Sequence, residues 1–460
     1  MPFVYNWTGV SNKSNNGGKM KKINLIILMT CLIINLFAYS LLEYEAGNYV
    51  QTVSARSSAM GTSGVAIGYS LFDSSLNPAN ITLLNNKLNA DLALTFTKNE
   101  EDRSLPMFNF FDSYIDNSTY SNNNNIFTNV SAGASYSHQM DSMTLSAGLM
   151  SRPLVDFSAK YEEQVRNDNS SDDDTYPPIL AKNFKEGEGA INAYSAILGA
   201  SYSFSDVNKL ALGLEIAMLN GSQNQESRIV WTEIAYTETE EALSDSLFKS
   251  ARDYDGMMFR LGATYDLNDR VRLGFAFQPK TECDMTAKNT IKFENIDTVT
   301  EMDADYIIPS SMRWGITYLP RNPYKTTFQM DMELNNYSEV SKFYDDVYSI
   351  YIGMEHYVGR AIPLRMGFKH EQSFGDAEIG AVSMPTVSAG TAFPIAKNLV
   401  FNISGEFSTR TYETLDLFRD GFYKKNGLWT SINPTDRGWE NPDKVEEQFF
   451  KVQTNISFTW

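Results

Sequence analysis

Cysteine and histidine are scarce in this sequence, which has 2 and 3 of them among 460 residues. Cys31 lies in an apolar N-terminal run, so removal of that run leaves Cys283 as a single thiol and no internal disulfide. The histidines are scattered, and no group of His, Cys and Asp has metal-ligand spacing. We therefore expect neither a disulfide framework, nor a metal site, nor a cofactor.

Excess positive charge is also missing. The chain has 38 Lys and Arg against 56 Asp and Glu, a formal net charge of -18. Binding of phosphate backbones requires clustered Lys and Arg, so nucleic acid is excluded as a partner. The sequence contains no Gly-x-Ser-x-Gly, no phosphate-binding loop and no His-Glu-x-x-His, and it does not predict an enzyme. A barrel lipase needs a placed Ser–His pair, and His138, His356 and His370 are interpreted as ordinary strand residues.

Long apolar runs are absent after one N-terminal stretch, Ile23–Tyr39. The basic Met20-Lys21-Lys22 precedes it, and Ala38 and Ser40 supply small residues at its end. This pattern predicts a secretory signal peptide that covers residues 1–40 and is cleaved after Ser40. Residues 1–19 are polar and Asn-rich, which indicates a mis-called extension before a true start at Met20. The alternatives are a single transmembrane anchor and lipidation at Cys31.

The rest of the chain shows many runs of about ten residues in which apolar and polar side chains alternate, as in the strands of membrane barrels. The last run is the clearest, with Phe450, Val452, Ile456, Phe458 and Trp460 on one face. A chain that ends on an aromatic residue after such a strand resembles the C-terminal signal of bacterial outer-membrane barrels. We therefore expect Phe458 and Trp460 to be read by the barrel-assembly machinery.

Other runs repeat this alternation. Their apolar faces include Leu88–Phe96, Tyr194–Tyr202, Leu210–Met218, Met257–Tyr265, Val271–Phe277, Met312–Tyr318, Phe328–Leu334, Leu364–Phe368 and Leu399–Phe407. Their opposite faces carry Glu215, Arg260, Arg272, Arg313, Asp331, Glu333, Arg365 and Glu406. Such charges are expected where one face meets a wet lumen and the other meets hydrocarbon.

Short and long connections alternate between these runs. The short ones are Gln139–Ser142, Ser205–Asn208, Asn268–Asp269, Pro320–Tyr324, Gly359–Ile362 and Pro394–Asn398. The long ones are Lys98–Asn125, Pro153–Gly189, Asn220–Tyr254, Pro279–Ser310, Asn336–Asp346, Gln372–Ser383 and Ser408–Lys444. Outer-membrane barrels follow this rule, with short periplasmic turns and long outer loops. The pattern therefore predicts that residues 88–460 form an all-β transmembrane antiparallel β-barrel of about fourteen strands, with both termini in the periplasm.

Residues 41–87 precede the first strand and are rich in Gly, Ser and Ala. A barrel of this size has a lumen too wide for side chains to fill, and a segment this small can thread inside as a hatch. The hatch pattern is Arg56-x3-Met60-Gly61-x2-Gly64, followed by Asn77-Pro78-Ala79. It resembles the N-terminal hatch of FadL-like outer-membrane proteins, which include fatty-acid and aromatic-hydrocarbon importers of the FadL and TodX types.

This resemblance implies a monomeric channel in the outer membrane of a Gram-negative-type bacterium, in contact with lipid and lipopolysaccharide, that takes up a hydrophobic small molecule. A landing site is expected at Met107, Phe110, Phe111 and Tyr114, which helical spacing would place near one another. The alternative is packing of these residues onto neighbouring loops. In the third loop, Ala242, Leu243, Leu247, Phe248 and Ala251 have the same helical spacing.

Three arginines are candidates for a ligand carboxylate in the lumen: Arg260, Arg313 and Arg365. The alternative for each is an ion pair with a lumenal acid such as Glu215, Asp331 or Glu333. Two other functions remain open for the whole chain. PorV-like secretion accessories share the same barrel, and a structural or adhesive barrel would use its loops to bind partners.

Overall fold

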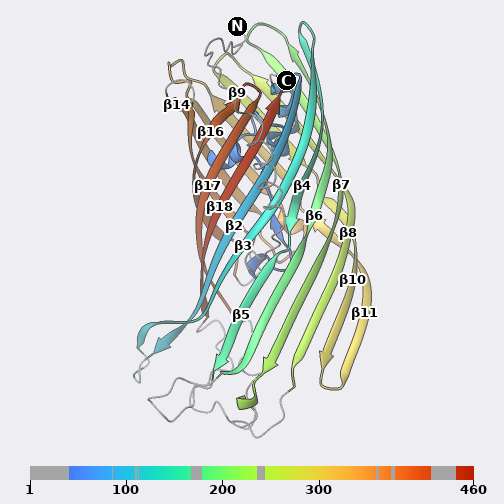
Figure 1. The fold of residues 1–460 in the computed structure, drawn as a ribbon, viewed down its shortest axis with the longest axis vertical. Helices are drawn as coiled ribbons and strands as arrows, with labels where there is room; N and C mark the ends of the chain where they lie inside the picture. The colour runs from blue at the N-terminus through green and yellow to red at the C-terminus, as the bar shows by residue number, and fades with distance from the viewer. Residues whose placement is uncertain are drawn as a thin grey trace, which may run out of the picture.

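Alternating apolar and polar residues build a closed antiparallel β-barrel (Figure 1). The computed structural model describes residues 41–84, 86–108, 111, 113–166, 179–235, 244–358, 362–374, 379–415 and 442–460. The described residues form eighteen hydrogen-bonded strands. One of them lies inside the barrel, and three others continue the preceding strand of the wall, which leaves fourteen wall strands. No helix of the described part is both long and apolar enough to cross a membrane.

The wall strands follow one another around the barrel in chain order. They are β2 (Leu88–Phe108), β3 (Tyr114–Gln139), β4 (Met143–Asp156) continued by β5 (Ala159–Arg166), β6 (Ile179–Ser203), β7 (Lys209–Trp231), β8 (Ser246–Asp266), β9 (Val271–Gln278) continued by β10 (Thr281–Phe293), β11 (Ile296–Ile308) continued by β12 (Ser311–Tyr318), β13 (Thr327–Asn335), β14 (Val347–Val358), β15 (Ile362–Ser373), β16 (Val382–Ala396), β17 (Leu399–Thr414) and β18 (Asp443–Thr459).

The first and last wall strands close the barrel. β18 pairs with β2 from Lys444 opposite Ser104 to Thr459 opposite Asn89. At the end of this seam, the backbone of Leu88 and that of Trp460 exchange two hydrogen bonds of 3.1 and 2.9 Å. Closure leaves no free strand edge along this line, as a membrane-spanning sheet requires.

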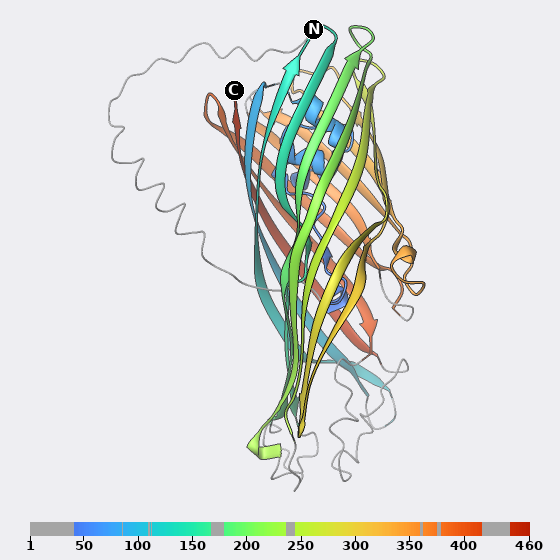
Figure 2. The ribbon, with the colours of Figure 1, turned by 90° about the vertical axis from the view of Figure 1, so that its right-hand side faces the viewer.

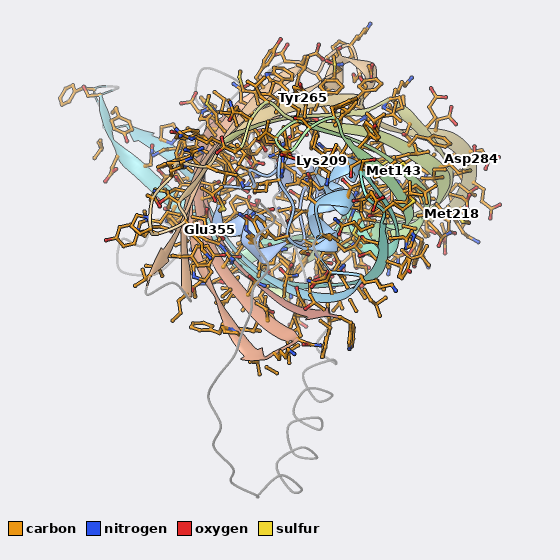
Figure 3. The ribbon with its side chains drawn as sticks, turned by 90° about the horizontal axis from the view of Figure 1, so that it is seen from above. Met143, Lys209, Met218, Tyr265, Asp284 and Glu355 are labelled. Atoms are coloured by element: carbon orange, nitrogen blue, oxygen red, sulfur yellow. The ribbon has the colours of Figure 1, made fainter. Side chains whose placement is uncertain are left out.

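The predicted faces are confirmed. Large apolar side chains of the wall point outward, for example Leu212, Met218 and Leu261, which are 55%, 66% and 52% exposed. Figure 3, seen along the barrel, places Met218 on the outer side of the wall. The predicted lumenal acids Glu215 and Asp331 are buried inside. These strands therefore have an apolar outer face and carry charged residues on their inner face.

The short links are confirmed as the turns of one barrel end, except that residues 359–361 of one link lie outside the described part. Among the long links, Asn336–Asp346 is confirmed, and so is Gln372–Ser383 to within two residues where the structure describes it. The others are wrong at least in part, because the strands continue well beyond the apolar band. The predicted link Lys98–Asn125 is mostly strand in β2 and β3, and Pro279–Ser310 is the hairpin of β10 and β11. Both faces of these extensions are polar or mixed, so period-two alternation did not reveal them.

Both predicted loop helices are also wrong where the structure describes them. Met107 lies at the end of β2 opposite Asp116, and Tyr114 begins β3. Leu247, Phe248 and Ala251 lie on β8, opposite β7 and β10. Cross-strand pairing overrides the local helical spacing at both places. Ala242 and Leu243 lie outside the described residues.

The N-terminal segment threads through the lumen, where Figure 2 shows it enclosed by the wall. It contains η1 (Leu41–Glu43), β1 (Asn48–Tyr49), α2 (Ala55–Ala59), η2 (Leu71–Ser75) and η3 (Pro78–Leu83). Ser54 caps α2, and Ser70 with Asp73 forms a capping box on η2. Asn77 caps η3 and Pro78 occupies its first turn, where proline is favoured.

Candidate functional site

The hatch packs backbone to backbone against a belt of wall glycines. A Cβ atom added to Gly367 would overlap the Gly61 nitrogen, and one added to Gly213 would overlap the Ala79 nitrogen. Gly262, Gly274 and Gly353 likewise face Asn77, Val65 and Met60. Sequence reasoning missed this belt. Its signal was present, because glycine inside a strand often marks the close approach of another backbone.

Backbone geometry explains two glycines of the predicted hatch motif. Gly61 has a φ of 64°, and a Cβ there would lie 2.6 Å from the Phe368 carbonyl oxygen. Gly64 has a φ of 155°, where an L side chain is strained. Inside the hatch, Asp73 accepts hydrogen bonds from the Ser57 hydroxyl at 2.7 Å and from the Tyr69 backbone at 2.7 Å. These contacts fold the hatch on itself.

A buried ion-pair network holds α2 against the wall. Arg56 Nη2 lies 3.1 Å from Glu355 Oε1, and Arg365 Nε donates to Glu355 Oε2 at 2.6 Å. All three side chains are at most 5% exposed. Arg365 also donates to Asn402 at 2.9 Å. Glu355 was not singled out from the sequence, although the hatch residue Arg56 required a buried carboxylate.

Arg313 binds the next turn of the hatch. Its guanidinium lies 3.1 Å from Asp331 Oδ2 and donates to the Thr62 carbonyl. Asp331 Oδ2 also accepts hydrogen bonds from the Gly64 and Val65 nitrogens at 2.7 and 3.0 Å. Arg313 therefore has the lumenal acid partner that the alternative interpretation named, and both residues serve to dock the hatch.

A cavity of about 70 Å³ lies between hatch and wall. Arg260 and Arg313 line it together with apolar side chains such as Leu76 and Leu154. Arg260 also donates to the Ser75 carbonyl and lies 3.4 Å from Glu215. Two side-chain atoms of lining residues, the Tyr49 hydroxyl and the Gln51 Oε1, have no hydrogen-bond partner among the described residues. The lining thus combines apolar surface with two arginines and two unpartnered polar atoms.

The wall has a seam beside this cavity. Pairing of β3 with β4 runs from Gln139 opposite Thr144 to Ala132 opposite Ser151, and no further pair joins the two strands. Beyond that point β1 takes the edge of β4, with Tyr49 opposite Val155 and the Val50 nitrogen 2.9 Å from the Leu154 oxygen. A side-chain bond crosses the seam, from Asn129 to Asp156 at 2.8 Å.

Farther along, asparagine side chains of β3 bridge to β5, the continuation of β4. Asn123 accepts from the Glu162 nitrogen at 2.9 Å and donates to the Glu162 oxygen at 3.3 Å, and Asn125 donates to the Lys160 oxygen. Side chains therefore replace the backbone ladder between β3 and β5. Pro153 was a signal for the seam, because proline inside a strand is confined to edges and bulges.

The predicted landing residues lie apart from the cavity. Phe111 and Tyr114 are 81% and 56% exposed at the far end of the β2–β3 hairpin, which projects away from the barrel (Figure 1). Phe110 lies outside the described residues. The hatch residues Arg56 to Ala79 and the three arginines lie in the lumen, whereas Phe458 and Trp460 stack on the outer surface with centroids 5.8 Å apart.

A closed fourteen-strand barrel with an N-terminal segment docked in its lumen defines the structural class. Solved structures then give the particular fold. A FadL homologue from Pseudomonas aeruginosa matches with a TM-score of 0.59 at 11% identity, over 90% of this chain and 100% of that one. The toluene transporter TodX of P. putida matches with 0.58 at 14%, over 89% and 99%. TbuX, a toluene transporter of Ralstonia pickettii, matches with 0.58 at 16%, over 89% and 99%.

The chain therefore has the FadL-type barrel fold, as the hatch motif indicated. No family model and no curated protein matches the sequence.

Proposed function

We propose that this protein is a non-enzymatic channel of the bacterial outer membrane that admits hydrophobic small molecules. One observation carries the proposal: Tyr49 and Val50 line the lumenal cavity and also occupy the edge of β4 at the wall seam. A short movement of β1 would join the cavity to the outside of the wall. The likeness in fold to the toluene transporters TodX and TbuX supports the same function.

The outer surface supports membrane insertion. Exposed apolar side chains form a band around the wall, and they include Leu92, Phe259, Trp314 and Phe368. Such a band is stable only against hydrocarbon, and a closed barrel satisfies its backbone there. We therefore infer a bilayer partner on all sides, with lipopolysaccharide against the outer leaflet.

The cavity supports a hydrophobic cargo. Apolar solutes cross a polar polysaccharide layer poorly, and a dry protein pocket lowers that barrier. Arg260 has a side chain 12% exposed at the cavity, so it is the arginine best placed for a ligand carboxylate. The cargo would leave through the β3–β4 seam after β1 detaches.

A disulfide across the seam tests this route in cells that lack their own uptake. Oxidised Asn129→Cys/Asp156→Cys is expected to reduce uptake of radiolabelled oleate or toluene several-fold, and a reductant is expected to restore it. The matched control is Ser137→Cys/Ser146→Cys, because these hydroxyls lie 2.8 Å apart where β3 and β4 are already paired.

Equal uptake by both oxidised variants and the wild type would refute exit through the seam. Equal uptake with and without the protein would refute transport itself. In that case, copurification with a secretion complex would favour an accessory role in protein export.

A further inference from the structure

One side of the barrel extends far beyond the apolar band, as β5–β8, β10 and β11 (Figures 1 and 2). On β7 and β8 the outward apolar series ends at Met218 and Met257, and the next outward residues are Asn220 and Asp255. Figure 3 places Asp284 of β10 on the same outer side. This extension therefore lies outside the band and presents a polar outer face.

β11 is the edge of the extension. It pairs with β10 along its whole length, from Ile296 to Ile308. In a closed ring its second neighbour would be β13, but β13 ends at Asn335, and the chain then turns away. Within the described ranges, no strand pairs with the second edge of β11. Its outward N–H and C=O groups are thus available to another strand.

Acidic side chains are the only protection that this edge has against strand addition. The segment Ile296–Ile308 contains no Lys, Arg, Pro or Gly, and it is rich in Ile, Val and Thr, which favour strands. Its inner face includes Met302, opposite the buried Ala287, and Tyr306, which packs on the inner core. Its outer face is acidic, with Asp297, Glu301, Asp303 and Asp305.

The acidic face is only partly neutralised. Lys292 lies 3.2 Å from Asp297, and Lys288 lies 3.5 Å from Glu301. Asp305 sits opposite Asp284, and no ion pair of the described residues includes either of them or Asp303. Like charges side by side disfavour pairing of β11 with a second copy of itself and favour a cationic neighbour.

We propose that the free edge of β11 binds an extended cationic segment of another protein by strand addition. The bound segment carries Lys or Arg at alternate positions, where they face Asp303 and Asp305, and small or apolar residues between them. Backbone hydrogen bonds supply the affinity, and the alternation of charge supplies the specificity. This inference does not depend on the channel function.

Three labelled nine-residue peptides test the proposal with the full protein in lipid nanodiscs, by fluorescence anisotropy. The first alternates Lys with Val or Thr, and the second groups the same lysines at one end. The third is the alternating peptide with N-methyl groups on four consecutive central residues, which removes backbone donors on both of its edges. The alternating peptide is expected to bind about tenfold more tightly than either control.

Protein variants locate the site. Asp303→Asn/Asp305→Asn is expected to lower the affinity for the alternating peptide by about tenfold, because two charge contacts are lost. The matched control is Glu188→Gln, which removes an exposed carboxylate from β6, away from the edge, and should leave affinity unchanged.

Equal binding of the N-methylated peptide would show simple charge attraction and overturn strand addition. Unchanged affinity of the double variant would place the site elsewhere. A dimer in light scattering without peptide, abolished by Thr300→Pro, would show that a second copy occupies the edge and would also overturn the proposal.

Discussion

At the residue scale, the hatch is held by contacts in which a single atom matters. The wall glycines admit the hatch backbone because they have no side chain, and Glu355 and Asp331 neutralise arginines that would otherwise be buried alone. The first kind of contact depends on space, and the second on charge. Both can be tested by substitutions that leave the outer surface of the barrel unchanged.

Gly367→Ala is expected to displace the hatch, because its new methyl group would occupy the position of the Gly61 nitrogen. Overpacking of this kind costs about 1–3 kcal/mol. Hydrogen exchange of residues 58–64 should accelerate. Gly405→Ala is the control, since a Cβ atom there meets nothing within 4 Å. Identical exchange in the two variants would contradict the close contact.

Glu355→Gln is expected to loosen α2, because Arg56 and Arg365 would share a buried site without a carboxylate. Breaking such a buried pair costs about 3–5 kcal/mol. Protease sensitivity of the hatch in the folded barrel measures the effect. Glu301→Gln removes an exposed pair with Lys288, which is worth about 0–1 kcal/mol, and should change nothing. A resistant hatch in Glu355→Gln would show that the glycine contacts suffice.

At the element scale, the sequence predicts each strand in which an apolar face points outward and a polar face points into the lumen. Leu212 and Glu215 belong to such a strand, and both lie on the predicted faces. The extensions of β2 and β3 escaped detection because Asn122–Asn125 carry no apolar face. The helix expected around Met107 failed because helical spacing does not report the pairing of β2 with β3 in a hairpin.

The candidate site was accessible from the sequence only in part. Arg56, Gly61 and Asn77 follow from the hatch motif, and Arg313 follows from strand alternation. Glu355 and the glycine belt depend on the path of the hatch through the lumen, and so does the seam, where β4 pairs with β1 in place of β3. Contacts between residues this far apart in the chain do not alter the alternation of apolar and polar residues, and Pro153 is the one local signal of the seam that we identify.

Asn123→Ala is expected to loosen β5 from β3, because both bonds from this side chain to the Glu162 backbone are lost while those of Ser121 and Asn125 to β5 remain. The cost is about 1–3 kcal/mol, so amide exchange at residues 160–164 should rise. Asn124→Ala serves as the control, since Asn124 points outward and donates to the Glu100 side chain. Slow exchange in Asn123→Ala would show that β5 is fixed without this side chain.

At the scale of the whole molecule, Trp460 closes the barrel and is also the residue that the sequence predicts as an assembly signal. The backbone of Trp460 makes the last two bonds between the first and last strands, and its side chain stacks on Phe458 outside the barrel. The two roles are separable, because closure needs only the backbone, whereas the predicted recognition by the assembly machinery would need the aromatic ring.

Trp460→Ala is expected to fold like the wild type in detergent, because the bonds to Leu88 remain, yet its assembled fraction in cells should fall several-fold. Deletion of Trp460 removes those bonds of 2.9 and 3.1 Å as well, so refolding in detergent should also suffer. Trp460→Phe keeps ring and backbone and should match the wild type. The shift of folded barrels on unheated gels measures each fraction. Normal assembly of Trp460→Ala in cells would remove the aromatic end as a signal and leave closure as its whole contribution.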